Sequence, residues 1–500
     1  MRMRRPALLG LLFLALGSFG WPQMGSAAQI ELYGASIRSA GLAGGGWALE
    51  DGGASLAVQP AALGLGEGDQ FRLHYLGGRV WMDPVSGVTL QEGYEDQAPR
   101  VTVQPQVISA DFVKGIGPWF RAGVHVNLPL PWLYSHETKD PWVPYSMRWQ
   151  NRVSRSMATV GFSGRIPIRG VKPEKDPFAG GLWLGAAFSI RPRGVIDVRL
   201  DLEGVSNSEG DAVEALLSEV VLAAKYMVRP QLSLLFDFGA VDARLSGLRF
   251  GASYFAEATT DISPIRLDVA VLGLGEVNAV FALVERLQAD VALGLSDFYD
   301  PHQVHLSLAL ERPRFALTGD VKVALWSQMV PSYGRIADEE GSELLVEFGS
   351  DLVEVFPVVS GRYFDETAFR DTVEATLGAE GRIPLPQAKA PGTELRIRGG
   401  LRYMQGIVVP NEGPMASIDG DTLSVGLGVG AVIGLNHSNE RLGPVKVDWA
   451  LQGIRLFGHA LPKSGEELSG AGQVPVEWSD DAEWTGGWAL VSGVSVGLGF

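Results

Sequence analysis

The chain has 500 residues, a formal net charge of −16 and no cysteine. The acidic balance argues against nucleic acid as a partner, and the lack of cysteine excludes disulfides, thiol chemistry and a cysteine-linked lipid. After the N-terminus no apolar run reaches the roughly 18 residues of a membrane-spanning helix, so a closed β-sheet is the one way left to span a bilayer.

The N-terminus has the pattern of a secretory signal peptide. Three arginines precede the apolar run ALLGLLFLALGSF, and Ala28 ends a small-residue cleavage site. We predict that residues 1–28 are removed, which takes away three positive charges and changes the net charge from −16 to −19. The expected destination is the bacterial outer membrane, reached by Sec-type export.

Apolar and polar residues alternate at period two along most of the remaining chain. Segments of about ten alternating residues between turns are typical of a transmembrane β-barrel, and a soluble β-sandwich is the alternative. We place fourteen strands, near 71–79, 102–113, 119–129, 154–165, 182–200, 216–228, 231–241, 302–311, 314–326, 372–383, 394–405, 421–434, 445–457 and 488–500.

The connections between these strands alternate between long and short. Two short ones are predicted as Arg-Pro turns, at Arg229-Pro230 and Arg312-Pro313. Bacterial barrels have short periplasmic turns and long outer loops, so the alternation favours a barrel over a sandwich. We therefore predict an all-β fold, a transmembrane antiparallel β-barrel over residues 69–500 with about 14 strands, 16 or 18 being the alternatives. Residues 242–301 are a divergent insert or extra strands; we expect no spanning strand from them, with two or four as alternatives.

Three short motifs are better explained by a structural role than by catalysis, metal binding or phosphate binding. Residues 493–497 spell G-x-S-x-G, but the three residues that follow leave no room for the Asp and His partners of a hydrolase, so we interpret them as the closing strand. His302 and His305 point to opposite faces of a strand, which is poor geometry for one metal. The glycine-rich run 426–434 lacks the helix and the Lys-Ser/Thr of a phosphate loop. We expect no enzyme, no catalytic residue, no metal and no cofactor.

The region before the first strand carries a family resemblance. It contains a Gly/Ala-rich stretch at 41–46, an Asp-Gly-Gly-Ala-Ser turn at 51–55 and Gln-Pro-Ala-Ala-Leu at 59–63. This order resembles the N-terminal segment of the FadL-like outer-membrane transporters of long-chain fatty acids and hydrocarbons, with Gln59 where that family usually has Asn. Residues 302–329 and 394–434 are similar to the same family in the order and spacing of their strands.

The resemblance implies that residues 29–68 form a hatch inside the barrel and that hydrophobic molecules enter passively and leave sideways. The implied hatch residues are Gly34, Gly41, Leu42, Gly44, Gly45, Asp51, Pro60, Ala61 and Leu63. We expect the lateral opening at the third strand, where prolines remove ladder donors. Its residues are Asn127, Pro129 and Pro131.

The loop after the third strand mixes aromatic residues with cations, as the site of an amphipathic ligand requires. We predict ligand access there, through Trp132, Leu133, Lys139, Trp142, Tyr145, Arg148 and Trp149; a loop stacked on its own aromatics is the alternative. The expected partners are outer-membrane lipid, a hydrophobic small molecule and the barrel-assembly machinery, which reads the terminal Phe500. The competing function is a structural or assembly barrel that holds a surface or periplasmic partner.

Overall fold

The structure is a computed structural model. It describes residues 33–66, 68–83, 85–90, 101–103, 106–130, 145–147, 157–166, 181–206, 212–259, 265–272, 284–294, 299–328, 335–336, 344–348, 351–356, 369–385, 392–407, 409, 416–434, 443–460 and 476–500. The predicted signal peptide lies outside these residues.

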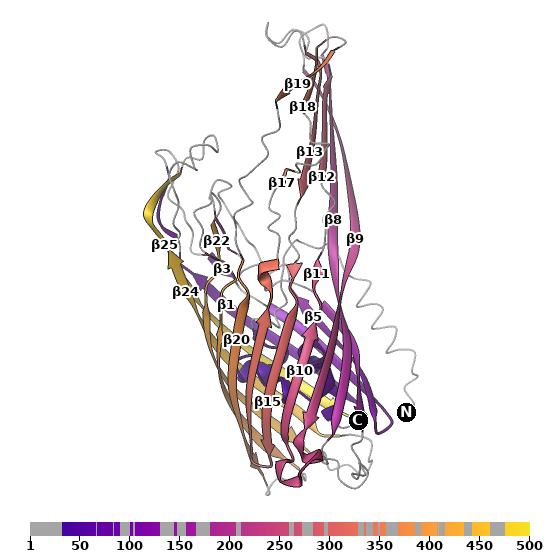
Figure 1. The fold of residues 1–500 in the computed structure, drawn as a ribbon, viewed down its shortest axis with the longest axis vertical. Coiled ribbons are helices and arrows are strands. Elements are labelled where there is room, and N and C mark those ends of the chain that lie inside the picture. The colour runs from indigo at the N-terminus through magenta and orange to yellow at the C-terminus, as the bar shows by residue number, and fades with distance from the viewer. Residues whose placement is uncertain are drawn as a thin grey trace.

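Fourteen antiparallel strands close into a barrel (Figure 1). The main sheet has sixteen strands, of which the short β2 (Val85–Leu90) and β3 (Val101–Val103) stand at its two ends. The other fourteen close because β1 (Gln70–Met82) pairs with β25 (Val476–Gly499). A closed wall leaves no unpaired strand edge, which is what a bilayer requires. The predicted barrel of about 14 strands is confirmed.

The remaining barrel strands follow one another around the wall in chain order. They are β4 (Gln106–Ile116), β5 (Phe120–Pro129), β7 (Met157–Ile166), β8 (Leu182–Ser206), β9 (Ala212–Asp237), β10 (Leu248–Phe255), β15 (Gln303–Arg312), β16 (Phe315–Ala324), β20 (Thr372–Pro384), β21 (Glu394–Met404), β23 (Thr422–Ile433) and β24 (Val445–Ala460).

The alternation in the sequence becomes an apolar outer face and a small or polar inner face. In β25, Trp488 and Val494 point outward and are 56% and 48% exposed, whereas Ser495 points inward and is 4% exposed. The G-x-S-x-G motif therefore lies inside a strand that is laddered to β1 and β24, as predicted. Among the described residues, no helix is long and apolar enough to cross a membrane.

The predicted turn at Arg229-Pro230 is wrong, because β9 runs unbroken through it. The carbonyl of Pro230 accepts a hydrogen bond from the backbone N of Ala256 at 3.0 Å. The N–H and C=O of one strand residue point to the same side, so the donor that proline lacks would also face β10. The ladder between β9 and β10 includes Gln231 but not Pro230, whereas the ladder between β9 and β8 continues through Pro230. The proline therefore removes no ladder bond to β8.

The expectation that residues 242–301 contribute no spanning strand is also wrong, because β10 pairs with both β9 and β15. The real turn between β9 and β10 contains η5 (Phe238–Ala240) and η6 (Ala243–Leu245). The two errors cancel: residues 216–241 hold one strand fewer than predicted and the insert holds one more. The other short turn is confirmed, with β15 ending at Arg312 and β16 beginning at Phe315.

Beyond the wall, β8 and β9 continue as a two-stranded ribbon, in register as far as Ser206 and Ala212. Figure 1 shows the ribbon rising from the barrel together with a second, five-stranded sheet. Its strands are β12 (Ile265–Leu272), β13 (Val284–Gly294), β17 (Arg335–Ile336), β18 (Leu344–Phe348) and β19 (Asp351–Phe356). Shorter pairs join β11 (Ala258–Thr259) to β14 (Tyr299–Asp300) and β6 (Tyr145–Met147) to β22 (Ala416–Ile418).

Candidate functional site

Residues 33–66, called the lumen segment below, fold into short helices inside the barrel (Figure 1). These are α3 (Ile37–Gly41), η1 (Trp47–Leu49), η2 (Gly53–Ala57) and η3 (Pro60–Leu65). Gly44 and Gly46 adopt φ of 96° and 84°, a region that favours glycine, which explains the glycine run between the first two helices. The chain can therefore turn tightly enough to fit within the wall.

The first part of the lumen segment is held by charge. Glu380 of β20 is surrounded by three guanidinium groups: Arg38 of the segment at 3.1 Å, Arg398 at 2.7 Å and Arg382 at 2.9 Å. The Arg38 Nη1 also donates to the carbonyl of Leu49 at 2.5 Å. The side chain of Glu380 is fully buried, so these hydrogen bonds replace its hydration.

A second ionic contact ties the end of this part to the first strand. Asp51 lies 2.6 Å from Arg72 of β1 and 2.6 Å from Lys446 of β24, and Glu50 lies 3.2 Å from Arg72. Burial raises the pKa of Asp51, but Lys446 and Arg72 lower it by more, so its pKa lies well below the ordinary 3.8. Asp51 is therefore charged at neutral pH and anchors the segment.

The second part of the lumen segment is held by neutral contacts. The backbone N of Ala61 donates to Ser233 at 2.6 Å, and its carbonyl accepts from Ser163 at 2.9 Å. Gln59 donates to the carbonyl of Leu234 at 2.7 Å. Gly185 of β8 lies so close that an added Cβ would overlap the backbone of Ala61. Small inward residues on the wall thus let the backbone of the segment touch it.

All nine residues that the resemblance assigns to a hatch lie in the lumen segment. Eight of them are buried, and Asp51 is half-buried. Gly41 packs on Gly428 of β23, where an added Cβ would come within 3.1 Å of the Gly428 Cα. Close packing on the wall accounts for Gly41, Gly44 and Gly45 among these residues.

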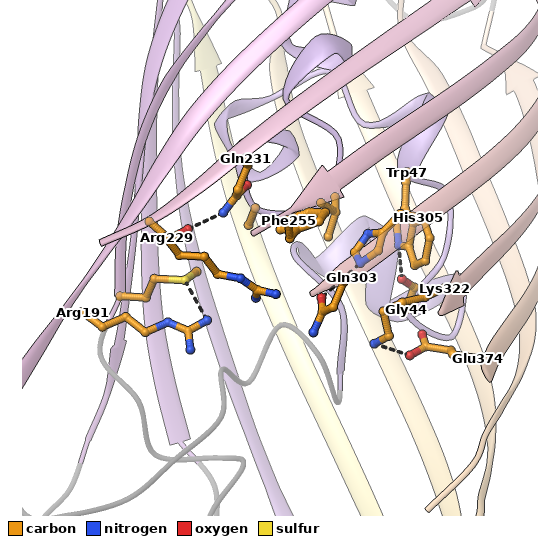
Figure 2. A pocket seen from close by; sticks show the side chains of 14 residues that line it. Gly44, Trp47, Arg191, Arg229, Gln231, Phe255, Gln303, His305, Lys322 and Glu374 are labelled. Atoms are coloured by element: carbon orange, nitrogen blue, oxygen red, sulfur yellow. Dashed lines mark hydrogen bonds and ion pairs between the residues drawn. The ribbon is translucent and has the colours of Figure 1, made fainter. Parts of the chain in front are cut away.

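A pocket lies between the lumen segment and the inner wall (Figure 2). Its volume of about 30 Å³ is well below the roughly 300–1,000 Å³ of ordinary ligand pockets. It is therefore too small for such a ligand in this conformation. The lining residues are Gly44, Trp47, Ala57, Val58, Met157, Ser189, Arg191, Arg229, Gln231, Phe255, Gln303, His305, Lys322 and Glu374.

Aromatic rings and cations meet in this pocket. The His305 ring lies between Trp47 and Phe255, with centroid distances of 4.6 and 4.3 Å. Lys322 pairs with Glu374 at 2.5 Å, and both belong to the inward faces of their strands. The pocket thus offers apolar ring surface and a buried ammonium group within one cavity.

On the opposite side of the pocket, Figure 2 shows Arg191 and Arg229 extending from β8 and β9. Arg191 pairs with Asp300. Arg229 donates to the carbonyls of Ala256 at 2.8 Å and Pro301 at 2.5 Å, and its guanidinium lies 5.3 Å from the centre of the Phe255 ring. These contacts fix both cations at the end of the wall from which the ribbon leaves.

The predicted access loop is not placed by the structure. Trp132, Leu133, Lys139, Trp142, Arg148 and Trp149 lie outside the described residues, and Tyr145 is described only through its backbone, which pairs with Ala416. Access through this loop stays a prediction.

The predicted lateral opening is described in part. Asn127 is buried and pairs with residues of both β4 and β7, and Pro129 pairs with Val107 of β4. Pro131 lies outside the described residues. The wall is paired on both sides of β5 from 120 to 127, and the ladder to β7 stops there.

Of the pocket residues, the sequence analysis named only Gly44, as a hatch residue, Arg229, in a predicted turn, and His305, in a motif set aside as structural. One signal was present: Lys322 and Glu374 are charged residues that alternate with apolar ones along their strands, and such residues face the lumen of a barrel. The pattern could not show that strands β8, β9, β15, β16 and β20 bring inward polar side chains to one cavity beside Trp47.

Comparison with known proteins returned similar solved structures. They include a Pseudomonas aeruginosa FadL homologue (14% identity, TM-score 0.46, covering 93% of this chain and 97% of that chain). They also include the Pseudomonas putida toluene transporter TodX (14%, 0.46, 96% and 100%) and the Ralstonia pickettii toluene transporter TbuX (16%, 0.42, 93% and 99%). No family model and no curated protein matches the chain.

Proposed function

We propose that this chain carries hydrophobic molecules across the bacterial outer membrane and that the lumen segment is its hatch. The observation that supports this most is a closed barrel, apolar outside, whose lumen is filled by its own N-terminal segment beside a pocket of rings and cations. Uptake is also what the sequence resemblance implies. Outer-membrane lipid surrounds the wall in this proposal, and the assembly machinery reads Phe500.

The pocket chemistry supports an apolar ligand, with or without an anionic end group. Trp47 and Phe255 offer ring surface to the apolar part. The ammonium of Lys322 has three donors, so beside its pair with Glu374 it can also donate to a ligand carboxylate, whose burial without a partner would be costly. Long-chain fatty acids use both features, and aromatic or aliphatic hydrocarbons use the rings alone.

Ligand binding requires the lumen segment to move. The pocket is too small for either ligand class, and Trp47 and Val58 of the segment form part of its lining. Displacement of the segment enlarges this cavity without unfolding the wall. Release is sideways, through the barrel wall, as the resemblance implies.

The test is uptake of labelled oleate and labelled toluene by liposomes that carry the folded protein. We expect uptake of at least one ligand above that of empty liposomes. Lys322→Met removes the cation and is expected to lower oleate uptake while leaving toluene uptake unchanged. The control is Lys114→Met, since Lys114 is exposed and pairs with Asp69 outside the lumen. Absence of uptake of both ligands contradicts the proposal.

A second function is favoured by one observation, the ribbon of β8 and β9 and its attached sheet. A barrel of this kind could hold a partner at the cell surface. Shortening the ribbon by equal lengths in both strands separates the functions: loss of surface binding with uptake retained assigns the ribbon to a partner.

A further inference from the structure

The boundary between β9 and β10, called the seam below, has a short ladder. It runs only from Arg249–Asp237 to Phe255–Gln231, the shortest ladder between neighbouring barrel strands in the described part of the chain. At 8 residues, β10 is also the shortest of those strands. Because ladder bonds hold neighbouring strands together, a short ladder leaves few of them to break.

A side chain closes the end of this seam from which the ribbon leaves. Pro230 has no N–H to donate to the carbonyl of Ala256, and Nε of Arg229 takes its place at 2.8 Å. Nη2 of Arg229 donates to the carbonyl of Pro301 at 2.5 Å. A side-chain bond of this kind is released by a rotamer change, whereas a backbone bond needs the strand to move.

From inside the barrel, Gln59 spans the same seam. Its Nε2 donates to the carbonyl of Leu234 in β9 at 2.7 Å and reaches that of Ala252 in β10 at 3.4 Å. Its Oε1 accepts a hydrogen bond from Ser253 of β10. Gln59 is completely buried and belongs to the lumen segment. Any displacement of this part of the segment therefore removes the bridge.

The wall next to the seam carries a cavity on each face. Phe255 and Gln303 line the inner pocket. Their sequence neighbours Tyr254 and Val304 point outward, because successive strand residues face opposite sides. With His302, Val323 and Leu325 they line an outer groove of about 300 Å³. One thickness of sheet separates the two cavities.

We propose that the ligand crosses the barrel wall at the seam between β9 and β10, when the lumen segment withdraws Gln59 and the Arg229 bond is released. This rests on the proposed function, and it assigns the ligand's path to a seam other than the third strand, where Asn127 is laddered on both sides. The outer groove receives the apolar part of the ligand.

A disulfide across the seam tests the passage. Pro230 and Ala256 form a hydrogen-bonded pair, so their neighbours Gln231 and Phe255 form a non-hydrogen-bonded pair. Such Cα atoms lie about 4.5 Å apart, within the roughly 4.4–6.8 Å range of a disulfide. The chain has no native cysteine to interfere. In the double variant Gln231→Cys with Phe255→Cys, we expect oxidation to lower uptake at least tenfold relative to the same variant reduced.

The matched control is Ser109→Cys with Asn127→Cys, at the end of the β4–β5 ladder. The backbone N of Leu130 donates to the carbonyl of Gln106, so this pair has the same geometry as the seam pair. Oxidation of the control is expected to leave uptake unchanged. The double variants are compared only as oxidised and reduced forms, which cancels the effect of the substitutions themselves.

Three results overturn the proposal. Equal uptake by both forms of the seam variant, with its disulfide verified by mass spectrometry, shows that the ligand does not cross at the seam. The proposed uptake function then still stands. Inhibition by the control pair alone places the opening at β5. Absence of uptake by the unmodified protein overturns the proposed function, and the passage with it.

A second measurement tests the bridge without transport. Gln59→Leu keeps the side-chain volume and removes the hydrogen bonds, so we expect amide hydrogen exchange in β10 to accelerate roughly tenfold while that in β16 does not change. Gln452→Leu is the control, because Gln452 is also buried, on the inward face of β24. Unchanged exchange in β10 of the Gln59 variant contradicts a bridging role.

Discussion

The two parts of the lumen segment are attached to the wall in different ways. Residues 33–51 also pack on inward glycines such as Gly428, but ion pairs add to this attachment, with Arg38 and Asp51 reaching carboxylates and cations of the wall. Residues 52–66 have no charged side chain and are attached by neutral hydrogen bonds and by backbone packed on inward glycines. Charge acts over several ångströms and tolerates small shifts, whereas close packing is lost when atoms are added or moved. The two parts should therefore respond to different mutations.

The largest effect is expected where one carboxylate serves three guanidinium groups. Glu380→Gln leaves Arg38, Arg382 and Arg398 without their shared charge, and breaking a buried pair costs about 3–5 kcal/mol. We expect a lower free energy of unfolding and faster proteolysis of residues 33–51 in the folded barrel. Glu394→Gln is the control, because Glu394 is 23% exposed and should cost about 1 kcal/mol or less. Equal losses in both variants would remove the special role of Glu380.

A smaller effect is expected in the packed part. Gly185→Ala pushes a methyl group into the backbone of Ala61, and overpacking of this kind costs about 1–3 kcal/mol. Proteolysis should accelerate at residues 52–66 and not at 33–51. Gly453→Ala is the matched strand control, since nothing lies within 4 Å of its added Cβ. If the two glycine variants behave alike, close approach is not what holds this part.

The smallest effect is expected at Asp51. Its side chain is 25% exposed, so water partly replaces the lost ion pairs, and Asp51→Asn should cost well below the roughly 3–5 kcal/mol of a fully buried pair. The pKa of Asp51 is lowered by folding, so its contribution is present above its ordinary pKa of 3.8 and is lost as pH falls through the lower folded value. We expect the protease protection of residues 33–51 to hold from neutral pH to about 4 and to fall below it. Loss of protection between pH 7 and 5 would exclude Asp51 as the cause.

Much of the barrel could be predicted because one rule repeats along it. Strands such as β15 and β25 alternate strictly, and lipid on one side and a packed lumen on the other enforce that alternation. The errors fall where the rule changes. At Pro230, β9 passes from wall to ribbon. The proline lacks only the bond to the carbonyl of Ala256, and the side chain of Arg229 makes that bond instead.

The lumen contacts could not be predicted in the same way. Arg38 and Glu380 are far apart in sequence, and alternation shows that a wall residue faces inward without showing which residue it meets. Gln59 marked a departure from the family pattern, yet its partners in β9 and β10 follow only from the register of two strands whose boundaries were misplaced.

One feature of the closing strands bears on the order of assembly. The backbone groups of Phe500 and Asp69 exchange two hydrogen bonds, of 3.0 and 2.9 Å, so the wall closes at the residue from which the chain enters the lumen. Pairings between distant parts of a chain form slowly, because the intervening chain must first be ordered. Until β25 pairs with β1, the barrel wall around the lumen segment is incomplete and the chain just after the segment, at Asp69, is not yet held by Phe500. We therefore expect ring closure and the final packing of the segment to be coupled, so a variant that closes slowly should leave residues 33–66 open to proteases for longer during biogenesis.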